Sequence, residues 1–277
     1  MRKGELIMAS GDLISLAQLK AHLGVQSSGD DIVLSALISQ ISRAIAAYLN
    51  RPFIWPRDVV DVFDGNGRDR IQLRHWPVVS VSSVSVNGQV VAPAATPQSA
   101  GWVLETSDLE PPGAMQQVIL RGGLFPRGWQ NISVAYRAGY QVSGETAVVP
   151  SAAPYLVQAG QPYGAFVCDM GVAYVSGAAL TGVAENPGQG QYVLDRVGGY
   201  YFSAADAGQT VVLNYGYAPA DLALCALEWA ADRYRYRERI GMISKSLGGQ
   251  ETAAFRLTAM PDFVALALRN FARIIAN

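Results

Sequence analysis

The sequence is poor in the side chains from which most active sites and cross-linked scaffolds are built. Its 277 residues include only two cysteines and two histidines, and 16% of the residues are charged. A small disulfide-stapled fold uses many more cysteines than this. We therefore expect Cys168 and Cys225 to be free thiols in a reducing compartment.

Charge and hydropathy exclude two further classes of protein. The formal net charge is −1 at pH 7, which excludes a globally basic nucleic-acid-binding protein but leaves room for a local basic patch. No apolar run approaches the roughly 20 residues that cross a bilayer. Residues 1–10 lack the apolar region of a signal peptide, so we expect no export. Either Met1 or Met8 can be the native start.

No catalytic or metal-binding pattern is present. His22 and His75 have no Cys, Asp or Glu at a spacing typical of a metal site or a catalytic triad. The segment Asp64–Asp69 resembles half of a calcium loop, but it lacks the glycine at position six and the acid at position twelve, so a β-turn is the better interpretation. There is no phosphate-binding loop that ends in Gly-Lys-Ser/Thr. We predict no catalytic residue, no metal, no cofactor and no enzymatic activity.

Helical periodicity is confined to the two ends of the chain. Two helices are predicted near the N-terminus, at residues 12–23 and 32–49; in the second, apolar residues recur at steps of three and four. Near the C-terminus a long helix begins at Asp221, and a last one covers 262–275.

Between these helices the apolar pattern changes to a period of two. Pro77–Val86 alternates valine and serine like a half-buried strand, and Asn87-Gly88 is the strongest hairpin signal in the chain. A second β-rich region follows a stretch of small residues and prolines.

Together these patterns predict an α+β fold. We expect a discontinuous helical bundle, made of the N-terminal helix pair and the C-terminal helices, that is interrupted by antiparallel β-rich modules. The predicted boundaries are 10–55 and 218–277 for the helical body, 56–140 for the first β module, 141–149 for a linker and 150–217 for an inserted second β module.

The most distinctive surface feature is a run of basic and aromatic residues late in the C-terminal helix. Its candidate interface or channel-facing residues are Arg233, Tyr234, Arg235, Tyr236, Arg237, Arg239 and Lys245. One interpretation is a solvated helix end, favoured by the helix dipole. The other is a surface that faces a neighbouring subunit or nucleic acid, since arginine and tyrosine are enriched at protein interfaces.

The order of these features resembles that of a known family. The segments that carry the resemblance are residues 14–25, 30–53, 60–88, 125–140 and 218–241. In order and spacing they are similar to the gp6-like head–tail connector proteins of tailed bacteriophages, also called head–tail adaptors or DNA-packaging proteins. Residues 141–217 depart from the smaller members of that family.

The resemblance implies a structural virion protein at the head–tail interface, present in the host cytoplasm during assembly. It implies a homo-oligomeric ring, of twelve subunits in typical members, that lies beneath the portal protein and extends the channel for double-stranded DNA used in packaging and genome ejection. Tail-completion or tail terminator proteins would dock below, and residues 251–277 would dock onto the portal. No membrane partner is implied.

A second hypothesis is a virion protein that binds a receptor or carbohydrate through its β modules. An aromatic platform for that purpose would use Tyr163, Phe166, Tyr174, Tyr192, Tyr200 and Tyr201. Ordinary strand core is the alternative interpretation of these residues.

Overall fold

The computed structural model describes residues 11–105, 116–195, 197–237, 244–247, 251–254 and 260–273, and for 244–247 and 251–254 it describes the backbone. The chain divides into two compact units. One contains Met1–Pro52 and Ala220–Ile274, and the other contains Phe53–Pro219 and Ile275–Asn277. We call them the helical unit and the all-β unit.

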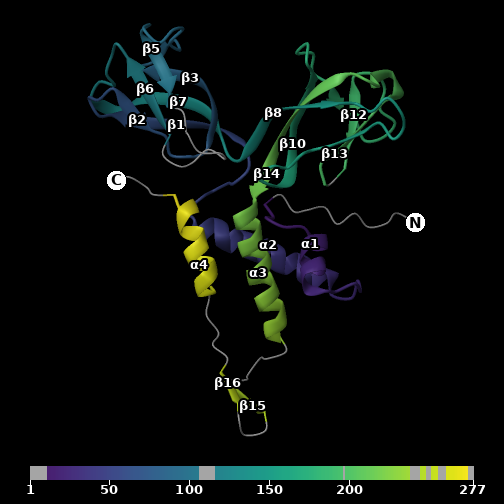
Figure 1. Cartoon of the computed structure of the whole chain (residues 1–277). Helices are drawn as coiled ribbons and strands as arrows, with labels where there is room; N and C mark the ends of the chain where they lie inside the picture. Colours follow the sequence, from purple (N-terminus) through teal and green to yellow (C-terminus); the bar gives the residue numbers. More distant parts are fainter. Residues whose placement is uncertain are drawn as a thin grey trace. The chain divides into compact units, whose positions relative to one another are not determined.

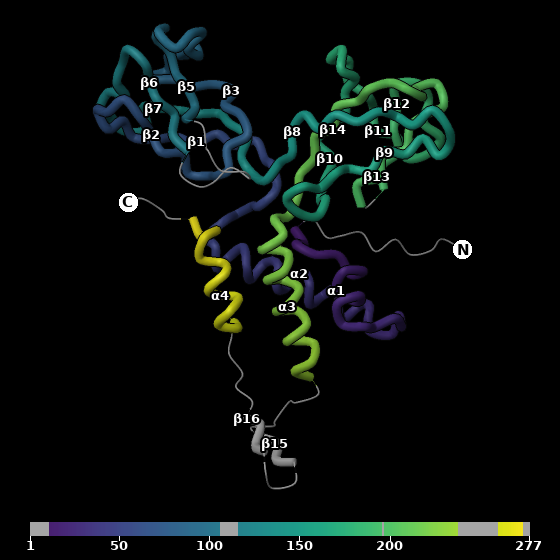
Figure 2. The backbone as a smooth tube through the Cα atoms, viewed as in Figure 1, coloured from purple at the N-terminus to yellow at the C-terminus, as the bar shows by residue number. Residues whose placement is uncertain are grey.

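The helical unit is assembled from opposite ends of the sequence (Figures 1 and 2). Its helices are α1 (Leu16–Leu23), α2 (Asp31–Tyr48), α3 (Ala220–Tyr236) and α4 (Asp262–Leu268), the last followed by a 3₁₀ turn (Arg269–Phe271). It also contains a two-stranded ribbon, β15 (Ser244–Leu247) with β16 (Glu251–Ala254).

Local sequence explains where the first helix begins and ends. Ser15 and Gln18 form a reciprocal capping box at its start, and Gly24 ends it in the left-handed conformation, with φ 71°. Helix α2 is long and apolar enough, by length and composition alone, to cross a membrane. Its apolar face, however, is buried within the helical unit, as expected of a core helix: Leu34, Ile38, Ile41 and Ile45 are at most 4% exposed.

The first half of the all-β unit contains two antiparallel sheets. One has the order β1-β7-β3-β4, from β1 (Arg57–Gly65), β7 (Gly128–Ala138), β3 (Val78–Val86) and β4 (Gln89–Val91). The other has the order β2-β6-β5, from β2 (Arg70–Gln72), β6 (Gln117–Arg121) and β5 (Gly101–Leu104). The predicted hairpin at Asn87-Gly88 is confirmed: both residues have positive φ, which a type I′ turn requires, and Val86 pairs with Gln89.

The second half of the all-β unit also contains two sheets. One has the order β10-β14-β8, from β10 (Gly164–Tyr174), β14 (Thr210–Pro219) and β8 (Gln141–Val148). The other has the order β11-β12-β13-β9, from β11 (Thr181–Gly182), β12 (Gln191–Leu194), β13 (Gly199–Phe202) and β9 (Leu156–Gln158). A 3₁₀ turn (Ala204–Asp206) precedes β14.

Buried tyrosines link the cores of these sheets to carboxylates. Tyr136 donates to Asp61 at 2.6 Å and Tyr215 to Glu145 at 2.5 Å. Tyr200 donates to Asp169 at 3.1 Å, and Tyr192 also donates to Asp169. Each carboxylate accepts a hydrogen bond from a hydroxyl group. A buried hydroxyl left without an acceptor would cost about 1–3 kcal/mol.

The prediction of a helical bundle interrupted by β modules is wrong. The chain is mixed but β-rich, because most of the described residues between Phe53 and Pro219 lie in strands or in the turns that join them. Helices α1 and α4 have only 8 and 7 residues, too few to span a bundle. The last helix, expected over 262–275, turns 3₁₀ at Arg269. The range 141–149, predicted as a linker, contains strand β8.

Candidate functional site

The basic and aromatic residues singled out from the sequence lie at the C-terminal end of α3. Arg233, Tyr234, Arg235 and Tyr236 occupy its last turn, and Arg237 follows directly. Of the other two candidates, Arg239 lies outside the described residues. Lys245 lies in strand β15 rather than on a continuation of the helix.

Two of these side chains form a cluster with Asp30, at the start of α2. The Tyr234 hydroxyl donates to Asp30 at 2.6 Å, and the Arg237 guanidinium makes two bonds to the same carboxylate, at 3.0 and 3.2 Å. Arg237 also donates to the Tyr234 oxygen at 2.7 Å and lies 4.0 Å from the centroid of its ring. The Arg237 guanidinium, and after it the Tyr234 hydroxyl, hold the pKa of Asp30 below its ordinary value.

The cluster fixes the start of α2 to the end of α3. On the next residue, Asp31 pairs with Lys20 of α1 at 2.6 Å, so the N-terminus of α2 is held by two neighbouring helices. Tyr234 and Arg237 therefore have a structural role inside the helical unit.

The pH dependence of the stability of the Asp30→Asn variant tests this contact. The pKa of Asp30 is lowered in the folded state, so its contribution to stability is present above the ordinary carboxyl pKa and is lost as the pH falls through the folded value. At neutral pH the variant is expected to have a lower urea midpoint for loss of helical circular dichroism, and the difference should vanish in acid. Asp58→Asn is the control, because the pKa of Asp58 is also lowered by an arginine, Arg137, but in the all-β unit. A difference for Asp30→Asn that persists unchanged in acid would contradict the ionic role.

Two hollows flank the end of α3. One, of about 350 Å³, is mainly apolar and is lined by Ile32, Val33, Ala36, Leu37, Gln40, Arg233, Tyr234 and Arg237. Ile32 and Val33 are 84% and 54% exposed at its edge. The other, of about 630 Å³, is lined by His22, Glu228, Ala231, Asp232, Arg235 and Phe263. Arg233 and Arg235 thus line different hollows on the two sides of the helix.

The two histidines and two cysteines of the sequence lie outside the cluster at Asp30. His75 stacks on Phe53 with ring centroids 4.9 Å apart, and His22 lines the second hollow. Cys168 and Cys225 are free, as predicted. Across the described residues, no group of three His, Cys, Asp or Glu side chains is placed to hold a metal ion.

The aromatic platform considered for a receptor or carbohydrate does not form. Phe166, Tyr192 and Tyr200 are 6%, 4% and 0% exposed and belong to the core of the second half of the all-β unit. The alternative interpretation as strand core is confirmed for these three residues. Tyr201 is 37% exposed.

Comparison with protein families gives a match at the N-terminal end of the chain. Residues 13–89 match the model of the phage gp6-like head–tail connector proteins. They carry a gp6-like head–tail connector domain. The resemblance inferred from the sequence is confirmed over this range, which begins before α1 and ends at the first residue of β4. The cluster at Asp30 therefore lies partly in the connector domain and partly on α3, beyond it.

Comparison with solved structures gives weaker similarities that span the whole chain. One is a chain from the neck of an empty gene transfer agent particle, with 16% identity and a TM-score of 0.41 over 99% of this chain and 96% of that one. Another is from the virion of a native gene transfer agent particle, with 15% identity and a TM-score of 0.43 over 100% and 98%. No curated protein matches the chain.

Sequence reasoning missed the role of Asp30 as the partner of Tyr234 and Arg237. The position of Asp30 just before α2 suits a helix cap, but its side chain makes no capping bond in the structure. Because 204 and 207 residues separate the partners, no local pattern reveals them.

Proposed function

We propose that this protein is a non-enzymatic head–tail adaptor of a tailed phage or phage-like particle. In this proposal copies form a ring beneath the portal, extend the channel for double-stranded DNA in packaging and ejection, and provide the platform on which tail-completion proteins dock. The observation that carries the proposal is the connector-family match over residues 13–89.

The helical unit supplies surfaces suited to such a ring. A ring closes through a heterologous interface, in which two different surfaces of each copy meet. The two hollows beside the end of α3 expose apolar side chains next to charged ones, as protein interfaces do. We assign the ring twelve copies by analogy with the family, and we place it in the virion after assembly in the host cytoplasm.

Native mass measurement and electron microscopy test the ring directly. The purified protein, alone or with the portal protein of the same particle, is expected to give a closed ring near twelve copies of the 29.6 kDa chain. A monomer that persists with the portal present would contradict the proposal.

Reversing the charge at Arg233, which lines the apolar hollow, is expected to abolish ring formation while the fold is kept. Arg237 is unsuitable for this test because its substitution would also break the contact with Asp30. Arg43→Glu and Arg57→Glu, made separately, are the matched controls, since each makes the same charge change at an exposed position outside α3. Native mass reports assembly, and thermal unfolding reports the fold. If Arg233→Glu leaves the rings unchanged, this helix end is a solvated surface.

A further inference from the structure

The first half of the all-β unit presents an unusual combination of exposed side chains on two neighbouring loops and at the start of strand β7. Trp129 is 89% exposed and Leu124 is 61% exposed. Arg68 and Arg127 are also exposed. Arg127 lies between Leu124 and Trp129 in the sequence, and Arg68 lies on the neighbouring loop, where its carbonyl accepts from Phe125. We call these four residues the tip. Exposed tryptophan and arginine are the residues most enriched among binding hot spots.

The loops that carry the tip are fixed by hydrogen bonds. Gly67 donates to the carbonyl of Phe125 and Phe125 to that of Arg68, both at 2.8 Å. The Asn131 side chain accepts from the amide of Gly65 at 2.8 Å and donates to the carbonyl of Pro126 at 2.9 Å. A surface held in this way loses little conformational entropy when it binds.

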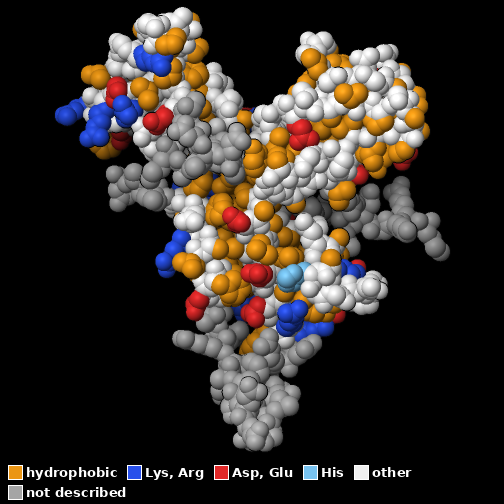
Figure 3. Space-filling model, viewed as in Figure 1, with side chains coloured by type: hydrophobic (Ala, Val, Ile, Leu, Met, Phe, Trp, Pro, Cys, Tyr) orange, Lys and Arg blue, Asp and Glu red, His pale blue; other side chains and the backbone are white. Residues whose placement is uncertain are grey.

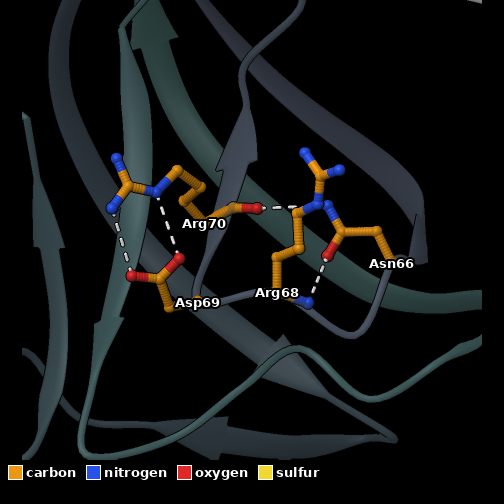
Figure 4. Close-up of polar contacts among 4 residues, drawn as sticks. All are labelled: Asn66, Arg68, Asp69 and Arg70. Atoms are coloured by element: carbon orange, nitrogen blue, oxygen red, sulfur yellow. Dashed lines mark hydrogen bonds and ion pairs between the residues drawn. The ribbon is translucent and has the colours of Figure 1, made fainter.

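One of the two acidic neighbours of the tip already has a cationic partner. Asp69 pairs with Arg70 at 3.1 Å, and Asn66 bonds to the backbone of Arg68 and Arg70 (Figure 4). Asp64 accepts from the backbone amide of Gln130 at 2.7 Å. Across residues 11–105 and 116–195, no carboxylate forms an ion pair with Arg68 or Arg127, and both side chains are exposed.

A complementary surface lies on the helical unit. The 630 Å³ hollow is lined by Glu228, Ala231, Asp232 and Arg235 of α3, by Phe263 of α4, which is 52% exposed, and by His22 of α1. Its two carboxylates outnumber its one guanidinium. Leu224 and Leu266, on the same two helices, are 50% and 65% exposed. Figure 3 shows acidic side chains among hydrophobic ones over α3 and α4. We call this surface the α3–α4 groove; its volume is in the range of pockets that hold a compact group.

We propose that the tip of one copy binds the α3–α4 groove of a second copy. The Trp129 indole fills the hollow against Phe263 and Ala231, while Arg68 and Arg127 pair with Glu228 and Asp232. The exposed tryptophan and leucine favour a protein partner over duplex DNA, because phosphate contacts use cationic and polar groups. The tip and the groove are different surfaces, so the contact is heterologous and can close a ring. This inference rests on the ring of the proposed function and names one of its contacts.

Charge reversal on either side is expected to prevent assembly. Arg68→Glu with Arg127→Glu gives a chain whose tip and groove are both acidic, and Glu228→Arg with Asp232→Arg gives one whose tip and groove are both basic. Each variant alone is expected to give the 29.6 kDa mass of a single chain. Trp129→Ala, which keeps every charge, is expected to weaken association roughly 30-fold.

Mixing the two charge-reversed variants provides the decisive measurement. In a one-to-one mixture the acidic tip meets a basic groove and the basic tip meets an acidic groove, so alternating copies should restore the wild-type mass. The restoration also shows that both variants are folded. Arg43→Glu with Arg57→Glu is the control for a double charge reversal and is expected to assemble alone.

The outcomes separate this contact from the ring itself. A wild-type ring together with rings in both charge-reversed variants would overturn the tip–groove contact and leave the ring intact. Loss of assembly in both variants without recovery in the mixture would also overturn the direct pairing. A wild-type chain that stays monomeric with the portal present would contradict the proposed function first.

Discussion

Raising the pH above about 10 is expected to unfold the all-β unit in one steep step. Burial, before any other cause, raises the pKa of six tyrosines of this unit: Tyr174 and the five most deeply buried ones, Tyr136, Tyr192, Tyr200, Tyr215 and Tyr217. These five are at most 4% exposed. The folded state therefore holds protons that the unfolded chain releases near the ordinary tyrosine pKa, so stability falls as the pH rises through that range.

The size of the effect follows from the number of tyrosines. Each contributes about 1.4 kcal/mol of lost stability per pH unit above the ordinary pKa, so the five together contribute about 7 kcal/mol per unit. A domain stable by about 5–15 kcal/mol then unfolds within about one to two units.

Phenolate absorbance and β-sheet circular dichroism, recorded together against pH, test this prediction. They are expected to change in the same step. Tyr200→Phe removes one of the five ionising groups, and it should reduce the dependence of the unfolding free energy on pH by about one fifth. Phenolate absorbance that rises well below the loss of sheet signal would show that the tyrosines ionise in the folded state, against the prediction.

Replacing Phe125 with alanine is expected to lower the free energy of unfolding of the all-β unit by about 3–5 kcal/mol. Phe125 is 0% exposed and belongs to the core formed with residues such as Val118, Ile132 and Val134. Its backbone also bonds to Gly67 and Arg68, so the loss of its ring disturbs the loops that carry the tip.

The neighbouring residue provides a matched control. Leu124 is 61% exposed, so Leu124→Ala is expected to change stability by no more than about 0.5 kcal/mol. Urea unfolding monitored by tryptophan fluorescence measures both variants. Equal effects of the two substitutions would contradict the assigned burial. Leu124→Ala is expected to weaken the tip–groove contact directly, because it changes the contact surface without changing the fold.

Much of the local structure follows from local sequence. Gly24 and Pro52 limit the first two helices, and Asn87-Gly88 determines a hairpin because that turn needs two residues with positive φ. The alternation in Pro77–Val86 likewise predicts strand β3. These features depend on neighbours within a few residues, so they are visible without tertiary information.

The overall balance of helix and strand is harder to predict. The small residues of 141–149 predict a linker, yet Gln141–Val148 forms the edge strand β8, which pairs with β14. Its backbone conformation is decided by the partner strand some 70 residues away and not by its own propensities. The last helix, predicted over 262–275, ends as an α-helix at Leu268. Helical spacing alone does not distinguish an α-helix from a 3₁₀ turn.

By itself the sequence determined that this protein has few candidates for catalysis, that its ends are helical and its middle β-rich, and that its N-terminal part resembles the gp6-like connectors. It also marked the arginines at the end of α3. The tertiary structure gives those arginines different surroundings. Arg237 binds Asp30, whereas Arg235 is exposed beside the α3–α4 groove. Only the tertiary structure exposes Trp129 next to Arg68 and Arg127. Such pairings join residues that are far apart along the chain, and only packing brings them together.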